Sequence, residues 1–451
     1  MTDPIALPSR DDPLVAATSE WIGGPAGTRV APRRSWWSPI RIALAVASVV
    51  LALGVAADKP CHDDGWADRG ERAMWTSLCY SDVPFMYRER GFAEGELAYR
   101  DSILEYPVLT GALMQASAWI VRDGPLALRS DTPDRAIAES RSFYDVTAVL
   151  MALAALVVVV ATARTVPRRP WDAMLVAASP VLLLTATINW DLLAVALASL
   201  AILAWTRERP MTAGVLIGLG TAAKLYPVLL LGPMLLVALR SANRREAMRR
   251  FALTASISVV TWSAVNLPVA LWAPDGWWSF FSFNAERGAD FGSIWQALDQ
   301  LRPGVLPADI DLLVVGFAVV LLVLIVGLAL AAPEPPRLAQ LAFLAVAAFL
   351  LANKVWSPQY TLWLLPLAVL ARPRWRDLLI WQAVEVVYFV AVWWNLATLF
   401  DPEHPIISGT VYGWTIVLRV AALLWLAGLV VRDILRPESD PVRPYVGVAT
   451  G

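Results

Sequence analysis

The chain has 451 residues, of which 58% are hydrophobic, and a mean hydropathy of +0.56. This apolar share exceeds the roughly 45–50% of soluble globular proteins and excludes that class. The formal net charge of -1 conceals arginines gathered in some loops and acidic residues in others, which is typical of polytopic membrane proteins. We therefore expect an all-α protein that crosses a membrane many times.

Residues 1–37 are polar and rich in proline and glycine, and we expect a disordered cytoplasmic tail there. The apolar stretch 40–57 lies too far from the N-terminus for an ordinary cleaved signal peptide, so it is predicted to be the first membrane span. The expected transmembrane domain covers residues 38–432. A second cytoplasmic tail, 433–451, would follow it.

Residues 58–104 form the longest hydrophilic stretch of the chain, and aromatic side chains alternate there with charges. This pattern is typical of short amphipathic helices at the membrane interface, and it predicts a large first outer loop that can cover a cavity. Cys61 and Cys79 both fall in this loop. In an oxidising compartment they would pair as a disulfide, and two free buried thiols are the alternative.

Arginine-rich turns mark the predicted cytoplasmic side of the remaining spans. They occur at 164–169, 207–209, 240–250, 372–376 and 432–436. Between them the apolar sequence forms hairpins with outward tips, which gives about 12 transmembrane helices with both termini inside. The hairpin arms are 172–188 with 192–206, 211–223 with 225–239, 252–272 with 310–331, 339–352 with 360–371, and 378–399 with 412–431.

The segment 105–121 does not fit this alternation. It is apolar enough to span, yet counting it as a span would place the turn 164–169 outside. Either it re-enters from the outer side, or the loop 122–141 is cytoplasmic and one hairpin is miscounted. Several hairpin arms are too short to cross fully, so their outer ends must meet water or protein. Short helices that end at one depth predict a cavity open to the outer leaflet.

The hairpin tips carry the unusual polar residues of the apolar region. Lys224 is the single charge within 211–239, and an ionisable residue in such a segment predicts a function unless its side chain snorkels to the interface. A cation at headgroup depth suits a lipid phosphate. Other tips hold "NWD" at 189–191, a second outer loop at 273–309, and "NKVWSPQY" at 353–360.

Several motifs occur in an order similar to that of one enzyme family. They are "CYSDVPFMYRERGFAEGELAY" followed by "EYPVLTG", then "AAKLYPVLLL", "FNAERGADFGSIWQAL" and "NKVWSPQYTLWLLP". From about residue 40 to 432 the chain resembles glycosyltransferase family 87, the polyprenyl-phospho-mannose-dependent transferases of the GT-C fold. The "NWD" turn departs from the Gly-Gln version more usual in that family, which leaves the substrate less firmly indicated.

The resemblance implies a metal-independent or weakly metal-assisted sugar transfer that uses a lipid-phosphate sugar as donor. It assigns the catalytic carboxylate to Asp82, which would take the proton of the acceptor hydroxyl while that oxygen attacks the anomeric carbon and inverts it. From spacing alone, Asp82 ahead of Val83 and Pro84 is more typical of a helix N-cap.

Further site residues are predicted on the outer tips. For the donor phosphate we predict Lys224, Lys354 and Arg287, with an exposed ion pair as the alternative for Arg287. Six side chains are predicted to bind substrate: Glu105, Tyr106, Asn189, Asp191, Gln359 and Tyr360. Glu105 could instead begin a helix, and Asn189 and Asp191 could cap one.

The two histidines, His62 and His404, lack the spacing of a metal site, so no metal is predicted. A divalent cation that assists phosphate departure is compatible with the chemistry but not required. The absence of nucleotide-binding fingerprints argues against a nucleotide-sugar donor. The expected partners are a polyprenyl-phosphate sugar, a glycan or glycolipid acceptor and membrane lipids, with no nucleic acid.

These observations predict a glycosyltransferase of the bacterial plasma membrane that adds mannose to an envelope glycan or glycolipid at a site on the periplasmic or extracellular side. A polyprenyl-phospho-arabinofuranose donor is the nearest rival. A transporter or flippase would use Asp191, Lys224 and Glu385 as pathway charges. Against it, the sequence has no evident internal repeat, and its polar residues gather on one face.

Overall fold

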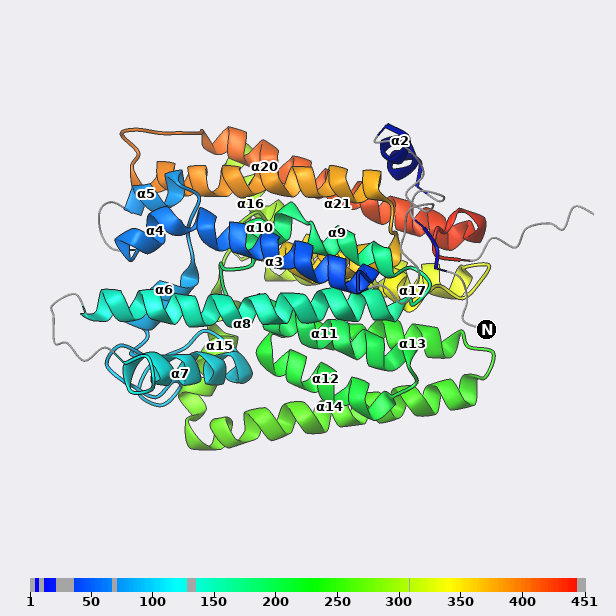
Figure 1. Cartoon of the computed structure of the whole chain (residues 1–451), viewed down its shortest axis with the longest axis horizontal. Coiled ribbons are helices and arrows are strands. Elements are labelled where there is room, and N and C mark those ends of the chain that lie inside the picture. The colour runs from blue at the N-terminus through cyan, green and yellow to red at the C-terminus, as the bar shows by residue number, and fades with distance from the viewer. Residues whose placement is uncertain are drawn as a thin grey trace, which may run out of the picture.

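The computed structural model describes residues 5–7, 12–21, 36–66, 71–127, 135–307 and 309–443. Within these ranges the chain is helical and contains no β-strand. Most of the helices run along the long axis of the molecule (Figure 1). Much of the predicted tail 1–37 and the last part of 433–451 lie outside the described residues.

Six of the described helices are long and apolar enough to cross a membrane. They are α3 (Pro39–Ala57), α8 (Arg135–Thr165), α14 (Arg244–Trp272), α17 (Asp311–Ala331), α20 (Trp375–Phe400) and α21 (Gly409–Leu435). Shorter apolar helices lie among them: α11 (Asp191–Thr206), α12 (Pro210–Ala223), η3 (Tyr226–Leu230) with α13 (Leu231–Leu239), α18 (Leu338–Ala352), and η4 (Pro358–Tyr360) with α19 (Thr361–Ala371). The chain is thus a multi-pass membrane protein, and the total of about 12 crossings stays a prediction.

The predicted arm 172–188 is not one helix. It is divided into η2 (Pro170–Ala173), α9 (Met174–Ala177) and α10 (Pro180–Thr185). Proline lacks the backbone N–H that would continue a helix, and the Ser179 side chain instead caps α10 by accepting from the Leu182 N–H. The Ser179 hydroxyl also donates to Gln382 Oε1 on α20 at 2.6 Å, which anchors the break inside the bundle.

The two ends of the molecule differ. One end holds α4 (Lys59–Asp64), α5 (Glu71–Thr76) and α6 (Asp82–Glu89) (Figure 1). We call it the cavity end, because α5 and α6 line a cavity there. Cys61 and Cys79 form a disulfide there, with 5.9 Å between their Cα atoms. The loop 273–309 contains α15 (Pro274–Glu286) and α16 (Ile294–Leu301).

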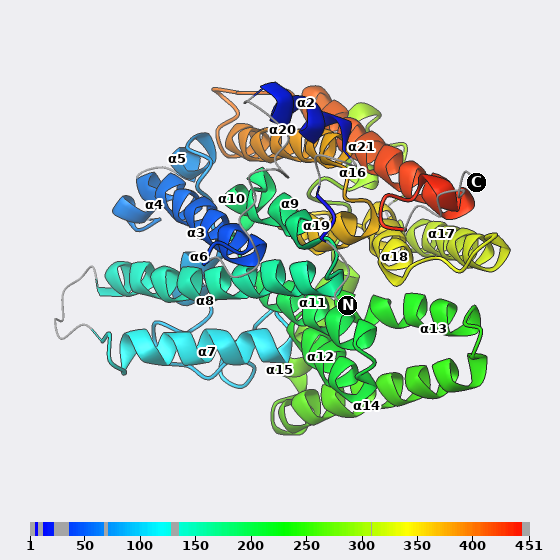
Figure 2. The ribbon, with the colours of Figure 1, turned by 45° about the vertical axis from the view of Figure 1, so that its right-hand side comes forward.

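The segment 105–121 forms α7 (Val108–Arg122). This helix lies in the half of the molecule that includes the cavity end (Figure 1). Its Thr110 hydroxyl donates to the Ala223 carbonyl at the end of α12, at 2.7 Å. The start of α8, next along the chain, contacts α6 through a 2.7 Å bond from the Tyr87 hydroxyl to Glu139. In Figure 1, α7 lies beside the part of α8 that is nearer to α6, and Figure 2 also shows α7 and α8 side by side. α7 is not among the six helices long and apolar enough to span, and the re-entry of 105–121 from the outer side stays a prediction.

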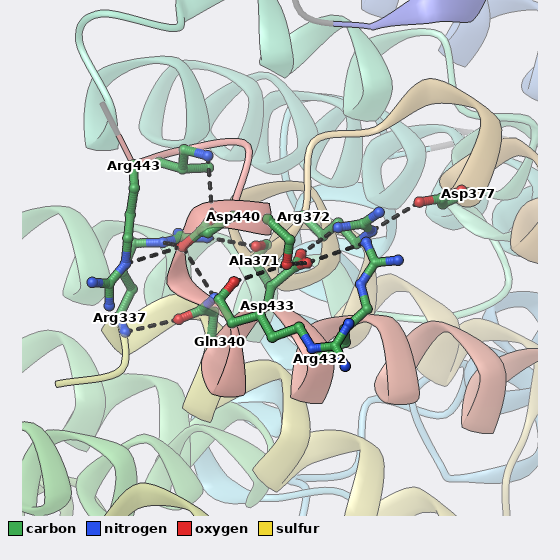
Figure 3. A network of polar contacts seen from close by, with 12 residues as sticks. Arg337, Gln340, Ala371, Arg372, Asp377, Arg432, Asp433, Asp440 and Arg443 are labelled. Atoms are coloured by element: carbon green, nitrogen blue, oxygen red, sulfur yellow. Dashed lines mark hydrogen bonds and ion pairs between the residues drawn. The ribbon is translucent and has the colours of Figure 1, made fainter. Parts of the chain in front are cut away.

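At the opposite end, which we call the arginine-rich end, buried ion pairs join the turns between helices (Figure 3). Arg372, after α19, pairs with Asp377 at 2.8 Å and with Asp433 on α21. Arg337, before α18, pairs with Asp440 at 2.7 Å. The predicted cytoplasmic turns and the described start of 433–451 therefore pack together at one end of the bundle.

Candidate active site

A cavity of about 660 Å³ opens at the cavity end. The first outer loop, the hairpin tips, α15 and the end of α20 all contribute to its wall. It brings together nine of the ten predicted site residues, from segments far apart in sequence. They are Asp82, Glu105, Tyr106, Asn189, Lys224, Arg287, Lys354, Gln359 and Tyr360.

Asp82 is the first residue of α6, and its neighbour Ser81 is the N-cap. The Ser81 hydroxyl accepts from the Val83 N–H, which leaves the Asp82 carboxylate out of the capping role. The Asp82 backbone N–H donates to the Ile188 carbonyl at 2.8 Å, so the "NWD" turn fixes the position of this residue. The alternative of Asp82 as the helix cap is therefore wrong.

Two tyrosine hydroxyls hold the Asp82 carboxylate in the cavity wall. Tyr80 donates to Oδ1 at 2.7 Å and Tyr106 donates to Oδ2 at 3.0 Å. Burial raises the pKa of Asp82 above its ordinary value of 3.8, against the lowering effect of the two hydroxyls and of the Lys224 charge. Burial and the neighbouring carboxylate also raise the pKa of Tyr80 and Tyr106, which keeps both hydroxyls protonated as donors.

Lys224 lies at the tip between α12 and η3, where its extended backbone ends α12. Its ammonium pairs with Asp191 Oδ1 at 2.8 Å, and its Nζ lies 5.3 Å and 5.2 Å from the ring centroids of Tyr106 and Tyr360. Only 16% of the side chain is exposed. An ion pair and aromatic faces, which attract cations, hold the charge at the cavity rather than letting it snorkel away.

The "NWD" turn separates the roles of its two polar residues. Asn189 Oδ1 accepts from the Asp191 N–H at 2.9 Å in a turn just before α11, whose N-cap residue is Trp190, and the Asn189 side chain also lines the cavity. Asp191 is buried behind the wall, where it pairs with Lys224 and accepts from the Trp363 indole N–H at 2.8 Å. Asp191 is thus the counterion of Lys224.

Lys354 and Arg287 line the cavity but each has a close carboxylate partner. Lys354 Nζ lies 2.7 Å from Asp311 Oδ1 and donates to the Ala285 carbonyl at 2.7 Å. Arg287 pairs with Asp290 at 2.7 Å. The two segments are joined by the bond from the Asp290 N–H to the Lys354 carbonyl, at 2.9 Å. Arg287 therefore forms the loop ion pair that the sequence offered as an alternative to a role in phosphate binding.

Glu105 faces the cavity as half of an ion pair with Arg90. The Arg90 guanidinium donates to Glu105 Oε2 at 2.9 Å and to Glu105 Oε1 at 2.6 Å. This bidentate geometry fixes the guanidinium and carboxylate planes relative to each other. The next helix, α7, begins only at Val108, so the expectation that Glu105 starts a helix is wrong. Of the six charged side chains that line the cavity, Asp82 alone has no ion-pair partner among the described residues.

The tip 353–360 is supported from below by a buried ion pair. Arg419 on α21 pairs with Glu385 on α20 at 2.9 Å and donates to the Trp356 carbonyl at 2.6 Å. This arrangement fits the expectation that Glu385 belongs to a network between helices. Above it, Tyr360 stacks on Trp363 with 4.1 Å between ring centroids. Gln359 reaches the cavity wall, and its buried Oε1 accepts no hydrogen bond from the described residues.

Sequence reasoning missed several side chains that complete the site. Tyr80 stands two residues before Asp82, Arg90 directly follows α6, and Trp363 stands one turn beyond Gln359. A helical-turn search around the predicted residues could have found Trp363, because residues three or four apart share one helix face. Nothing local in the sequence indicates that Tyr80 and Tyr106 both donate to one carboxylate.

Among the described residues, no three His, Cys, Asp or Glu side chains form a group that could hold a metal ion. His62 bonds to Asp145 at 3.1 Å, and His404 bonds to Asp401 at 3.2 Å, both on the surface. The expectation that no metal is needed stays a prediction.

Comparison with known proteins gives one family match. Residues 138–358 match the model of glycosyltransferase family 87, a range that includes Lys224, Arg287 and Lys354 but begins after Asp82. Among solved structures, the crystal structure of ArnT from Cupriavidus metallidurans bound to undecaprenyl phosphate is similar over 87% of this chain and 77% of that chain, with 15% identity and a TM-score of 0.45. No curated protein matches the chain.

Proposed function

We propose that the chain is a glycosyltransferase of family 87, whose model matches residues 138–358, and that it moves a sugar, mannose, from a polyprenyl phosphate to a cell-envelope glycan or glycolipid. One observation carries the proposal. Asp82 and Lys224 line the same cavity on either side of Tyr106, whose hydroxyl bonds to the carboxylate and whose ring faces the ammonium. A base and a cation thus stand beside a single reacting centre.

In this reaction Asp82 is the general base. It takes the proton of the acceptor hydroxyl as that oxygen forms a bond to the anomeric carbon, and the bond from that carbon to the phosphate oxygen breaks. The electron pair leaves with the polyprenyl phosphate, and the anomeric centre inverts. Tyr80 and Tyr106 position the carboxylate. Among the described residues Asp82 has no ion-pair partner, which supports this role, because a paired carboxylate would be a weaker base.

The departing phosphate needs positive charge, and the cavity wall supplies it. Four basic side chains face the cavity against two carboxylates, Asp82 and Glu105. Lys224 is the main candidate, because three aromatic rings and Asp191 direct its ammonium into the site. Arg287 and Lys354 would assist it from the opposite loops. Gln359, Tyr360 and Asn189 would then contact the sugar.

We place the cavity on the outer side of the plasma membrane and both termini inside. The arginine-rich end supports this orientation, because short arginine-rich turns favour the cytoplasm. The described N-terminal residues also contact that end, where the Ala6 N–H donates to the Arg168 carbonyl at 2.6 Å. The disulfide at the cavity end suits an oxidising compartment.

No observation favours a rival function. A transporter needs a polar path through the bundle, whereas the predicted pathway charges Asp191 and Lys224 satisfy each other at the cavity and Glu385 is buried against Arg419. An arabinofuranose donor would use the same base and cation, so the donor sugar is decided by the assay.

A transfer assay with purified protein tests the proposal. The donor is tritium-labelled polyprenyl phosphomannose or its arabinofuranose counterpart, and the acceptors are envelope glycans and glycolipids. Wild-type protein is expected to label one acceptor class from the mannose donor. Asp82→Asn is expected to lose about 10²–10⁴-fold in rate, the usual contribution of a general base.

Asp299→Asn is the matched control, since this carboxylate is exposed on α16 and does not line the cavity. Its rate should equal that of the wild type. Transfer that Asp82→Asn leaves undiminished would remove Asp82 as the base. Movement of intact donor across vesicles without sugar transfer would instead establish a flippase.

A further inference from the structure

Five aromatic side chains form one continuous side of the cavity, which we call the aromatic wall. Trp75 is at its centre, with ring centroids 4.7 Å from Tyr80, 5.5 Å from Trp393 and 5.6 Å from Phe400. The interplanar angles of these pairs lie between 13° and 28°. Phe85 extends the wall by stacking on Tyr80. All five side chains line the cavity.

The wall joins two segments more than 300 residues apart. Trp75 comes from α5 in the first outer loop, and Trp393 and Phe400 come from the outer part of α20. An ion pair from Arg72 to Asp401 fastens α5 to the end of α20, and Arg72 also donates to the His404 carbonyl at 2.9 Å. The two halves of the wall are therefore held in register by specific polar contacts.

Two indole groups of the wall lack a hydrogen-bond partner. Trp75 is 6% exposed and Trp393 is 2% exposed, yet neither Nε1 donates a bond to any described residue. Each Nε1 is itself buried, so these two N–H groups are unused polar groups inside the wall and do not face the cavity. A ligand in the cavity would therefore meet the wall through the parts of the rings that line it.

The wall leads directly to the proposed base. Its member Tyr80 donates to Asp82 Oδ1 at 2.7 Å, so a ring stacked beside Tyr80 would present its hydroxyls near this carboxylate. Lys224 lies on the other side of Tyr106, among Tyr106, Tyr360 and Trp363. The cavity thus has a neutral aromatic side and a cationic side, with Asp82 between them.

From this arrangement we infer that the aromatic wall is the acceptor subsite and that the acceptor presents a pyranose ring there. The face of an aromatic ring is electron-rich, and the C–H face of a pyranose ring is weakly positive, so the two stack favourably. The inference rests on the proposed transferase function and deepens it by assigning the sugar ring of the glycan or glycolipid acceptor to this wall.

Acceptor choice and wall variants test the inference together. Octyl glycosides of mannose, glucose and galactose are compared with octyl glycerol ether, which offers hydroxyls without a ring, using labelled polyprenyl phosphomannose. An octyl glycoside is expected to be glycosylated and the ether is not. Trp75→Leu should raise the acceptor KM about tenfold while the donor KM stays within twofold, because Trp75 supports the rings of the wall and lies away from the cationic side of the cavity.

Milder variants keep the test informative if Trp75→Leu does not fold. Trp75→Phe keeps the ring and removes the N–H, and Phe400→Leu changes a side chain that is 54% exposed. Each should raise the acceptor KM about threefold. Trp394→Leu is the matched control on the same helix, because Trp394 does not line the cavity, and it should change neither KM.

Three outcomes would overturn the inference or its premise. Equal transfer to the ether would exclude a ring-binding subsite. A rise in the KM of long-chain donors, with an unchanged acceptor KM, would assign the wall to the polyprenyl chain. Absence of transfer from every donor to every acceptor by the wild type would instead refute the proposed transferase function.

Discussion

Charged side chains are buried at both ends of this molecule, but their partners differ. At the arginine-rich end, Arg372 is 5% exposed and pairs with both Asp377 and Asp433, in the network shown in Figure 3. At the cavity end, the Asp82 carboxylate is bonded by two neutral hydroxyls and by no cation of the described residues, with a cavity of about 660 Å³ beside it.

The difference separates charges that stabilise the fold from charges that are kept for chemistry. Burial of an ion is costly, and full pairing offsets much of that cost. A carboxylate that is buried without a cation destabilises the fold. Such a group is expected at a functional site, where it must accept a proton. Substitutions at the two ends should therefore have opposite signatures.

The largest effect is expected on stability, from Arg372→Leu. It leaves Asp377 and Asp433 buried without their shared cation and should cost about 3–5 kcal/mol in the free energy of unfolding. Arg376→Leu is the control, since Arg376 also pairs with Asp377 but is 68% exposed, and it should cost less than about 1 kcal/mol. Unfolding in detergent micelles measures both, and equal losses would contradict the distinction.

At the cavity end, Lys224→Met should lower kcat/KM for the donor about 100-fold, because the departing phosphate loses its cation. The variant also leaves Asp191 unpaired, so its stability should fall. The double variant Lys224→Met with Asp191→Asn removes both charges and should regain stability without regaining transfer. Recovery of transfer in the double variant would mean that the pair only supports the fold.

The pH dependence should report the burial of Asp82. The base acts when ionised, so transfer is full above its raised pKa and falls about tenfold per pH unit below it. Tyr80→Phe and Tyr106→Phe remove hydroxyls that stabilise the ionised form, so the acid limb should move to higher pH. The profile of kcat/KM measures this, and a limb moving to lower pH would refute the assignment.

The smallest effect is expected from Lys354→Met. Although Lys354 faces the cavity, Asp311 and the Ala285 carbonyl already hold its ammonium, and the Asp311 carboxylate is 55% exposed. Its loss should change donor kcat/KM by less than about fivefold. A loss as large as that of Lys224→Met would show that the phosphate displaces Asp311 during the reaction.

The sequence predicted the long helices well, because a run of consecutive apolar residues is enough to indicate a span. The expected spans 40–57, 378–399 and 412–431 are found as α3, α20 and α21, each with slightly wider bounds. The arm 172–188 was predicted less well, because hydropathy alone does not reveal that Pro180 interrupts the helix inside an apolar run. Its three pieces hold together only through contacts with other helices, such as that of Ser179 with Gln382.

The sequence predicted which residues gather at the site, but it did not predict which side chains pair with one another. Charge and hydropathy placed Asp82, Lys224 and the tip 353–360 on one side, and they do line one cavity. The sequence offered no sign that Lys224 would pair with Asp191 or Glu105 with Arg90. It also left open whether 105–121 spans or re-enters.

The sequence by itself thus determined a helical membrane protein with its polar motifs collected at one end, because hydropathy and the distribution of arginines act segment by segment. Only the tertiary structure decided which cavity carboxylate has no ion-pair partner among the described residues, which indoles keep an unused N–H, and where α7 packs. Those outcomes depend on packing between residues tens to hundreds of positions apart, and no local pattern encodes that packing.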